Sequence, residues 1–130
     1  MVKPGDTLQY TITVEKNHLA SSIKSGCLDV LATPAVVAMM EYAALQLAEK
    51  DLPEGISTVG TAIAIDHLAA APLGAEVSVK ATLIKVTDGR FYDFEVEASD
   101  CKGLLAKGTH SRASVKSEKF QQKANSKYEV

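Results

Sequence analysis

The chain has 130 residues, which fits a single domain, and we expect one domain over residues 1–130. Its formal net charge of −2 lacks the basic excess that general nucleic-acid binding requires. Aromatic residues make up only 5% and Trp is absent, so the core has to be built from aliphatic side chains.

The chain contains no signal for export, membrane insertion or metal binding. Its amino-terminal residues lack the apolar segment of a signal peptide, and no apolar run reaches the length of a membrane-spanning helix. Cys27 and Cys101 have neither metal-ligand nor redox spacing, and His18, His67 and His110 lie far apart in the sequence. We therefore expect a soluble cytoplasmic protein with free thiols, no metal site and no membrane partner.

The amino-terminal third begins with a strand and a loop. Residues 5–15 alternate between apolar and polar side chains, which is typical of a half-buried strand. Residues 16–32 have no clear period and are rich in Ser, so they predict a loop. Long ordered loops are often functional.

A helix is predicted from Thr33 to Lys50. Thr33 suits the N-cap and Pro34 the first helical position, and most of the following residues are strong helix formers. At about 100° per residue, the apolar side chains form one broad arc, with Ala35 and Met39 on the polar side.

Glu41 falls inside this apolar arc, between Val37 and Ala44. Buried glutamates are uncommon because the loss of water disfavours their charge. Taken alone, Glu41 is best interpreted as a residue at the edge of the arc that reaches solvent or a cation. The alternative is a catalytic carboxylate at the base of a cleft.

Strands are predicted at residues 58–67, 75–87, 91–100 and 104–115, and Asp88-Gly89 predicts a hairpin between the second and third of these. Regular alternation in the first of them places Val59, Thr61, Ile63, Ile65 and His67 on one face and Gly60 on the other.

The order of these elements predicts an α+β fold, with one long helix packed on one face of an antiparallel sheet. The edges of such a sheet invite pairing with a second copy. Residues 117–130 form a polar tail, which we expect to be solvated and partly flexible.

Three segments together resemble the hot-dog fold of acyl-CoA thioesterases, and they are most similar to the fluoroacetyl-CoA thioesterase family. These segments are residues 30–41, 59–67 and 108–113, and residues 118–120 are also similar. Each motif alone is common, but the set has the order and spacing of that family. The resemblance implies a dimeric hot-dog fold, a homodimer or tetramer with the active site between subunits, and an acyl-CoA substrate. It implies no cofactor apart from the CoA that the substrate carries.

The resemblance also implies a set of site residues. In that family a Thr at the helix start, a Glu two turns later and a His on the next strand are catalytic. Here they correspond to Thr33, Glu41 and His67. The backbone N–H of Gly60 is implied to hold the thioester carbonyl, and Arg112 is implied to lie beside the substrate.

The chain departs from the family pattern at three places. Pro34 replaces a Gly and Tyr42 replaces a Trp. Residues 27–29 are Cys, Leu and Asp, where aromatic side chains would help to close a small acyl pocket. These departures bear on selectivity for a fluorinated acyl group rather than on thioester hydrolysis.

The chemistry is consistent with these residues, since thioester hydrolysis needs a nucleophile, a proton acceptor and an oxyanion donor. In one mechanism His67 activates Thr33 for attack and Glu41 orients His67. In the other, Glu41 attacks or activates water, and Thr33 and His67 position it. Simpler interpretations are an N-cap for Thr33, a turn-bonded side chain for His67 and a structural ion pair for Arg112.

Two other functions are compatible with the sequence. A hot-dog dimer could hold acyl-CoA or a small hydrophobic ligand without turnover, although the three reactive side chains argue against this. A hydratase or dehydratase is disfavoured because the helix carries no His. Several cations are candidates for the phosphates of CoA, and the sequence does not choose among Arg90, Lys102, Lys107 and the lysines of the tail.

Overall fold

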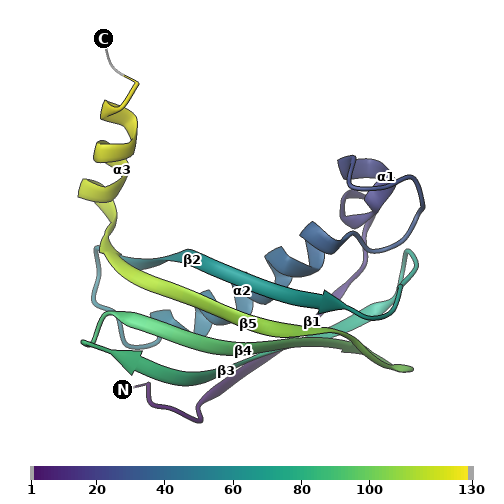
Figure 1. Cartoon of the computed structure of the whole chain (residues 1–130), viewed down its shortest axis with the longest axis horizontal. Helices are drawn as coiled ribbons and strands as arrows, with labels where there is room; N and C mark the ends of the chain where they lie inside the picture. Colours follow the sequence, from purple (N-terminus) through teal and green to yellow (C-terminus); the bar gives the residue numbers. More distant parts are fainter. Residues whose placement is uncertain (1, 129–130) are drawn as a thin grey trace.

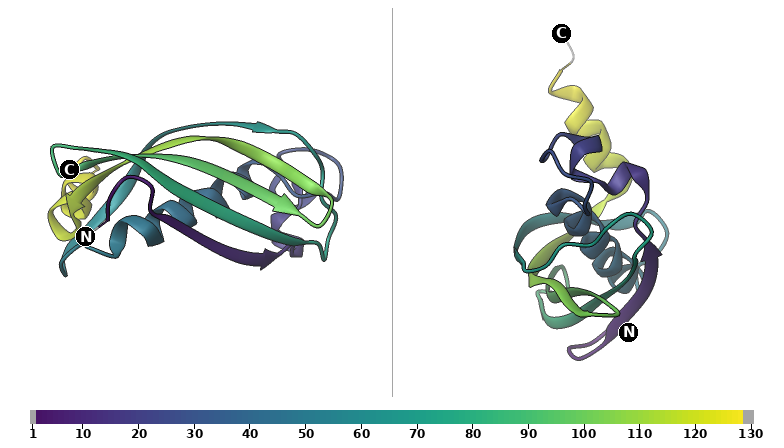
Figure 2. Two further views of the ribbon diagram at one scale, coloured as in Figure 1. Left: turned by 90° about the horizontal axis from the view of Figure 1, so that it is seen from below. Right: turned by 90° about the vertical axis from the view of Figure 1, so that its right-hand side faces the viewer.

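The structure, a computed structural model that describes residues 2–128, is an antiparallel sheet wrapped around one long helix (Figures 1 and 2). Five strands lie in the order β1-β3-β4-β5-β2. They are β1 (Thr7–Thr13), β2 (Ile56–His67), β3 (Glu76–Thr87), β4 (Phe91–Asp100) and β5 (Gly103–Lys116). The helix that the sheet encloses is α2 (Thr33–Glu49). This arrangement confirms the predicted α+β class.

The core lies between α2 and the concave face of the sheet. The most deeply buried helix side chains, Val36, Met40, Ala43 and Leu47, recur at helical spacing and face the apolar residues of β3 and β4. Ala35 and Met39 are also buried, so the prediction that placed them on the polar side was wrong. The sheet curves far enough for β1 to cover that flank as well.

Because the buried stripe includes Ala35 and Met39, its centre lies further from Glu41 than the sequence predicted, and Glu41 lies at its edge. Val37, Glu41 and Leu45, one helical turn apart, are each only partly buried. They lie on the flank of α2 opposite to Tyr42, which contacts Tyr10 of β1. Glu41 is therefore not sealed in the core, and its edge position agrees with the simpler interpretation of its place on the helix.

Strand β2 contains a bulge that regular alternation does not predict. Gly60 pairs with Arg112 of β5 and Ala62 pairs with Ser111, so Thr61 is the extra residue. A side chain at Gly60 would point at Glu41 of α2, and His67 also contacts α2. The prediction that Gly60 and His67 face opposite sides of the sheet was therefore wrong, because the bulge shifts the alternation by one residue.

Strand β2 is an edge of the sheet within this chain. Gly60, Thr61, Ala62, Ala64 and Asp66 are exposed along it. An edge strand presents unpaired backbone N–H and C=O groups that can pair with another strand. The exposed backbone of β2 is therefore a suitable place for a second copy to add to the sheet.

The segment predicted as a loop, residues 16–32, contains little regular structure but is held in place by backbone contacts. It contains a 3₁₀ turn, η1 (Lys16–His18), and one helical turn, α1 (Ala20–Ile23). Bridges join Leu19 to Leu31 and Val30 to Pro72. These contacts hold the segment against the start of α2.

The polar tail forms a helix, α3 (Ser117–Ser126), which is a difference from the irregular end that the sequence predicted. None of its residues is buried, so it is solvated as expected, and it projects away from the sheet past the β2 edge (Figures 1 and 2). Residues 129 and 130 of the predicted tail lie outside the described residues. No helix within residues 2–128 has the length and hydropathy to cross a membrane.

Candidate active site

Thr33 and His67 form a hydrogen-bonded pair at the amino-terminal end of α2. Ala32, not Thr33, is the N-cap of the helix, and Thr33 makes no capping hydrogen bond. Its Oγ1 lies 2.8 Å from Nδ1 of His67, at the end of β2. The interpretation of Thr33 as a plain N-cap is therefore wrong, and His67 bonds a hydroxyl rather than a turn.

The second ring nitrogen of His67 has no partner among the described residues. Nε2 is buried and makes no hydrogen bond within residues 2–128. Buried polar atoms are usually paired, and an unpaired one calls for an explanation. A carboxylate brought to Nε2 would complete a Thr–His–carboxylate chain of the kind that activates a hydroxyl nucleophile.

A shallow pocket of about 340 Å³ opens beside this pair. Thr33 and His67 contribute to its wall, and the remaining lining is mainly small and aliphatic: Ala20, Val30, Leu31, Ala32, Ala69 and Ala70. No described residue that lines it is aromatic. The pocket therefore offers a small apolar space next to a hydroxyl–imidazole pair.

Glu41 lies two turns further along α2 and faces Gly60 of β2. A Cβ atom added at Gly60 would lie 2.7 Å from Oε2 of Glu41, so a larger residue there would displace the carboxylate from its position. The Glu41 side chain is 41% exposed, whereas that of Arg112 beside it is 7% exposed. The carboxylate thus combines a buried neighbour on one side with an open face on the other.

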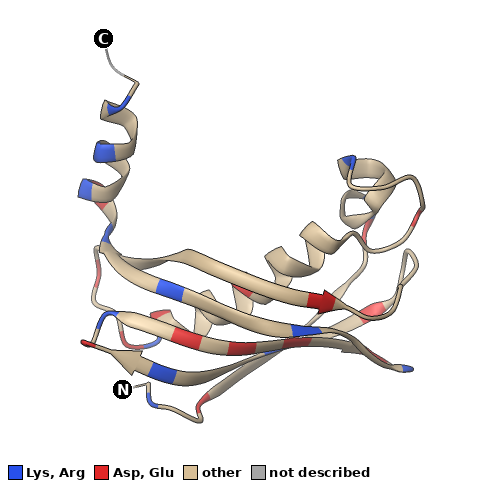
Figure 3. Ribbon diagram, viewed as in Figure 1, with Lys and Arg blue, Asp and Glu red and all other residues tan. Residues whose placement is uncertain are grey.

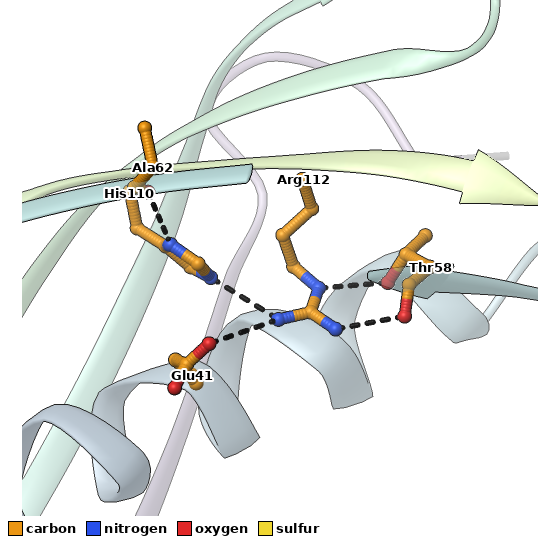
Figure 4. Close-up of polar contacts among 5 residues, drawn as sticks. All are labelled: Glu41, Thr58, Ala62, His110 and Arg112. Atoms are coloured by element: carbon orange, nitrogen blue, oxygen red, sulfur yellow. Dashed lines mark hydrogen bonds and ion pairs between the residues drawn. The ribbon is translucent and has the colours of Figure 1, made fainter. Parts of the chain in front are cut away.

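Arg112 of β5 is the buried neighbour, and its guanidinium is held from three directions (Figure 4). Its Nε donates to Oγ1 of Thr58 at 2.7 Å and its Nη2 donates to the Thr58 carbonyl at 2.8 Å. Its Nη1 lies 3.9 Å from Oε2 of Glu41. Burial lowers the pKa of Arg112, and the nearby charge of Glu41 opposes that change.

His110 completes this buried cluster. Arg112 Nη1 lies 3.2 Å from Nε2 of His110, and because a guanidinium can only donate, Nε2 must accept. The other nitrogen, Nδ1, then carries the proton and donates to the Ala62 carbonyl at 2.8 Å. Burial lowers the pKa of His110, and the charge of Arg112 acts in the same direction. The cluster therefore contains a neutral His110.

Sequence reasoning did not select His110 or Thr58. Both residues follow the alternation of their strands, as do many residues without a role. The pairing of Gly60 with Arg112 is what brings them together. Thr58 lies two residues before Gly60 on β2, and His110 lies two residues before Arg112 on β5. That pairing is visible only once the strand register is known.

The structure brings the predicted residues together as two groups rather than one. Thr33 contacts His67, and Glu41 lies with Gly60 and Arg112. Glu41 lies eight positions after Thr33 in α2, a rise of about 12 Å along the helix axis. Within one chain, the expected three-residue site is therefore divided.

Comparison with known proteins identifies the family. The profile of the fluoroacetyl-CoA-specific thioesterases matches residues 14–118, most of the chain. The chain belongs to this family. The fluoroacetyl-CoA thioesterase of Streptantibioticus cattleyicolor is 38% identical over 99 residues, covering 76% of this chain and 70% of that protein.

Solved structures of the fluoroacetyl-CoA-specific thioesterase family and of other hot-dog proteins share the fold. A structure of a fluoroacetyl-CoA thioesterase superposes with a TM-score of 0.93 at 30% identity and covers 99% of both chains. A thioesterase superfamily member from Thermus thermophilus gives a TM-score of 0.85 at 25% identity, covering 96% of this chain and 92% of its own. A hot-dog-like protein from Thermanaerovibrio acidaminovorans, at 22% identity and a TM-score of 0.86, covers 98% of this chain and 93% of its own. The predicted hot-dog fold is thereby confirmed.

Proposed function

We propose that the chain hydrolyses the thioester of a small acyl-CoA to CoA and a free acid, at a site completed by a second copy of the chain. The observation that carries this proposal is the division of the site into two groups, with Thr33 and His67 in one and Glu41 in the other. Membership of a family of acyl-CoA thioesterases supports the reaction type. The homodimer and the composite site are our inferences.

Pairing along the exposed β2 edge would unite the two groups. In an antiparallel pair with twofold symmetry, Gly60 can lie opposite His67 of the second copy, and His67 opposite the second Gly60. Glu41 lies against Gly60, so its open face would then turn toward the unpaired Nε2 of the other His67. One such dimer would contain two equivalent sites.

The first chemical route uses Thr33 as the nucleophile. Its hydroxyl attacks the thioester carbonyl while Nδ1 of His67 accepts the hydroxyl proton, and the CoA thiol leaves with a proton returned by His67. Water then hydrolyses the acyl-Thr33 ester with the same base. Glu41 of the second copy would orient His67 through Nε2, and the Gly60 N–H would bind the developing oxyanion.

The second route uses Glu41 as the reactive group. In one form its carboxylate attacks the carbonyl, the C–S bond breaks to release CoA, and water hydrolyses the resulting mixed anhydride to free the acid and Glu41. In the other form the carboxylate takes a proton from a water molecule that attacks the carbonyl, and the CoA thiol leaves with that proton. In both forms the Thr33–His67 pair positions the thioester. In both routes Arg112 contacts Glu41 rather than solvent, because its side chain is buried and held by Thr58. We therefore assign Arg112 a positioning role for Glu41, instead of the direct substrate contact that the sequence suggested.

The acyl group would occupy the pocket beside Thr33 and His67. A volume of about 340 Å³ with a lining of alanines and short aliphatic residues suits a short acyl chain. Cys27, Leu28 and Asp29 are exposed and do not line it. We propose a small aliphatic acyl group as the substrate class, without a preference for fluorine.

Mixed dimers test the composite site. Thr33→Ala and Glu41→Gln subunits, each first verified to be inactive alone as the first route requires, are refolded together at equal concentration with different affinity tags. A mixed dimer pairs the intact Glu41 of one subunit with the intact Thr33 of the other at one of its two sites. Random mixing should therefore restore about a quarter of wild-type activity, since half the dimers are mixed and half their sites are intact.

The control mixes Thr33→Ala with His67→Ala, which damage the same half of the site and should restore nothing. Co-purification through both tags verifies that subunits have exchanged. Restored activity only in the first mixture supports the composite site, and no restoration in either mixture contradicts it. Absence of CoA release by the wild-type protein across a panel of short acyl-CoAs would contradict the reaction itself.

A further inference from the structure

A basic pocket lies at the opposite end of β2 from His67, where β5 runs into α3. Its volume is about 470 Å³. Four cations and three apolar side chains dominate its lining: Arg90, Lys116, Lys119, Lys123, Ile56, Val115 and Phe120. Figure 3 shows the basic positions along α3 and at the adjoining end of the sheet. This concentration of positive charge stands out in a chain with a net charge of −2.

Part of the pocket is built in advance of any ligand. Arg90 donates from Nε to the Ser114 carbonyl at 3.1 Å, and its guanidinium carbon lies 5.0 Å from the centre of the Phe91 ring. These contacts orient a guanidinium, whose several N–H groups suit phosphate oxygens. Phe120 is 47% exposed on α3, although it is a large apolar side chain.

The charge of this pocket is not balanced by its own lining. None of the described residues that line it is acidic, and Glu118 on α3 is not among them. The contrast is with the outer face of the sheet, where Lys80 and Lys107 share a pocket with Asp66, Glu95 and Glu97. Binding of an anion is therefore favoured in the α3 pocket, whereas the carboxylates of the pocket on the outer face of the sheet would repel it.

The position of the pocket fits a ligand that also reaches the thioester site. Ile56 lines the pocket and precedes Gly60 on β2 by four residues, a distance of about 13 Å along the strand. The acyl-CoA molecule has the same layout, since a long uncharged pantetheine arm separates its thioester from a phosphorylated adenine nucleotide. An exposed aromatic ring beside cations suits an adenine base and its phosphates.

We infer that this pocket binds the phosphorylated adenosine end of acyl-CoA, with Lys119 and Lys123 contacting phosphate, Arg90 supplying an oriented guanidinium and Phe120 packing against the base. The inference rests on the proposed thioesterase function and names the substrate contacts of that site. It selects among the cations that the sequence left open, and it sets aside Lys102 and Lys107, which line neither the pocket nor α3.

The test is a comparison of two substrates in a charge-reversal variant, Lys119→Glu/Lys123→Glu. Both lysines are exposed on α3, so the fold should tolerate the change. For acetyl-CoA the KM should rise at least about fivefold with kcat little changed, because each exposed cation–phosphate contact contributes a few-fold in affinity. For S-acetyl-pantetheine, which lacks the nucleotide, kcat/KM should stay at the wild-type value. Lys127→Glu, just past the end of α3 and outside the pocket, is the control.

Direct binding separates this inference from the proposed reaction. Adenosine 3′,5′-bisphosphate should bind the wild-type protein in calorimetry, and the double variant should lose that binding while Lys127→Glu keeps it. This result would support the pocket even if no acyl-CoA were hydrolysed. An unchanged KM for acetyl-CoA, equal losses with both substrates, or no binding of the bisphosphate to the wild type would overturn it. A change in the oligomeric mass of the double variant without a change in KM would also overturn it, since α3 would then contribute only to the contact between subunits.

Discussion

The two ends of the divided site differ in how firmly the chain holds them. The Thr33–His67 pair has one hydrogen bond, an exposed hydroxyl residue and a ring nitrogen without a partner among the described residues. The cluster around Arg112 is buried, and its guanidinium contacts Thr58, His110 and Glu41. One end is thus incomplete within a single chain, and the other is internally satisfied except at the open face of Glu41.

This difference separates two tasks. A guanidinium bonded through all three of its nitrogens cannot rotate without breaking buried hydrogen bonds, so it fixes the charge that faces Glu41. The Thr33–His67 pair beside its pocket has space for a substrate instead. Substitutions of the buried residues around Arg112 should accordingly lower the free energy of unfolding, whereas substitutions of Thr33 or of the open carboxylate of Glu41 should act mainly on activity.

The largest effect is expected on turnover. Glu41→Gln should lower kcat by about 10²–10⁴-fold, since it removes the charge in either chemical route. Thr33→Ala distinguishes the routes: a comparable loss, partly recovered in Thr33→Ser, indicates attack by the hydroxyl, whereas near-normal turnover of Thr33→Ala excludes it. Steady-state CoA release is the measurement. Full activity of Glu41→Gln would contradict both routes.

The second effect concerns the free energy of unfolding. Arg112→Met should cost about 3 kcal/mol, because it leaves the buried acceptors on Thr58 and His110 without their donor. Thr33→Ala should change stability by less than about 1 kcal/mol, since its side chain is exposed. Urea denaturation of both variants provides the comparison. Equal destabilisation by the two substitutions would contradict the assignment of tasks.

The smallest effect is a pH dependence that belongs to His110. Burial lowers the pKa of His110 below its ordinary 6.5, so the unfolded chain takes up a proton first as the pH falls. The free energy of unfolding should therefore decrease below about pH 6.5 by at most about 1.4 kcal/mol per pH unit, until the folded His110 is also protonated. Above that pH His110 contributes no slope.

A His110→Gln variant isolates the contribution of His110 to this slope, because it removes the imidazole but keeps a side-chain N–H donor for the Ala62 carbonyl. Between pH 5 and 7, the free energy of unfolding obtained from denaturation curves should change less with pH for the variant than for the wild type. An equal pH dependence in the two proteins would show that His110 does not titrate in this range. Glu41 and Arg112, which face His110, remain present in both proteins.

The sequence predicted the α+β architecture because the run of helix-forming residues after Pro34, the alternation of the strands and the Asp88-Gly89 turn are local signals. Both turn residues indeed adopt positive φ values of 55° and 64°. It did not predict which flank of α2 is covered, since burial of Met39 depends on how far the sheet curves. His110 and Thr58 were missed for a related reason: their role depends on strand register and not on residue type.

The division of the site was implied by the family resemblance, which places the active site between subunits, but not by the residue pattern itself. The predicted residues lie in one or the other group, and in our proposal the contact between Glu41 and His67 depends on the surface of a second copy. The predicted alternation of side chains along β2 is also interrupted at Thr61, where the bulge adds one residue. A bulge has no reliable signature in residue type, because any residue can occupy the extra position.

The bulge has a consequence for how the chain can vary. Gly60 and His67 are an odd number of positions apart, which in a regular strand would put them on opposite faces, and only the extra residue at Thr61 lets both face α2. The number of residues between Gly60 and His67 therefore has to stay constant for both to face α2. Loops at either end of β2 can lengthen or shorten independently, but deleting one residue inside the interval would turn either Gly60 or the imidazole of His67 to the outside of the sheet.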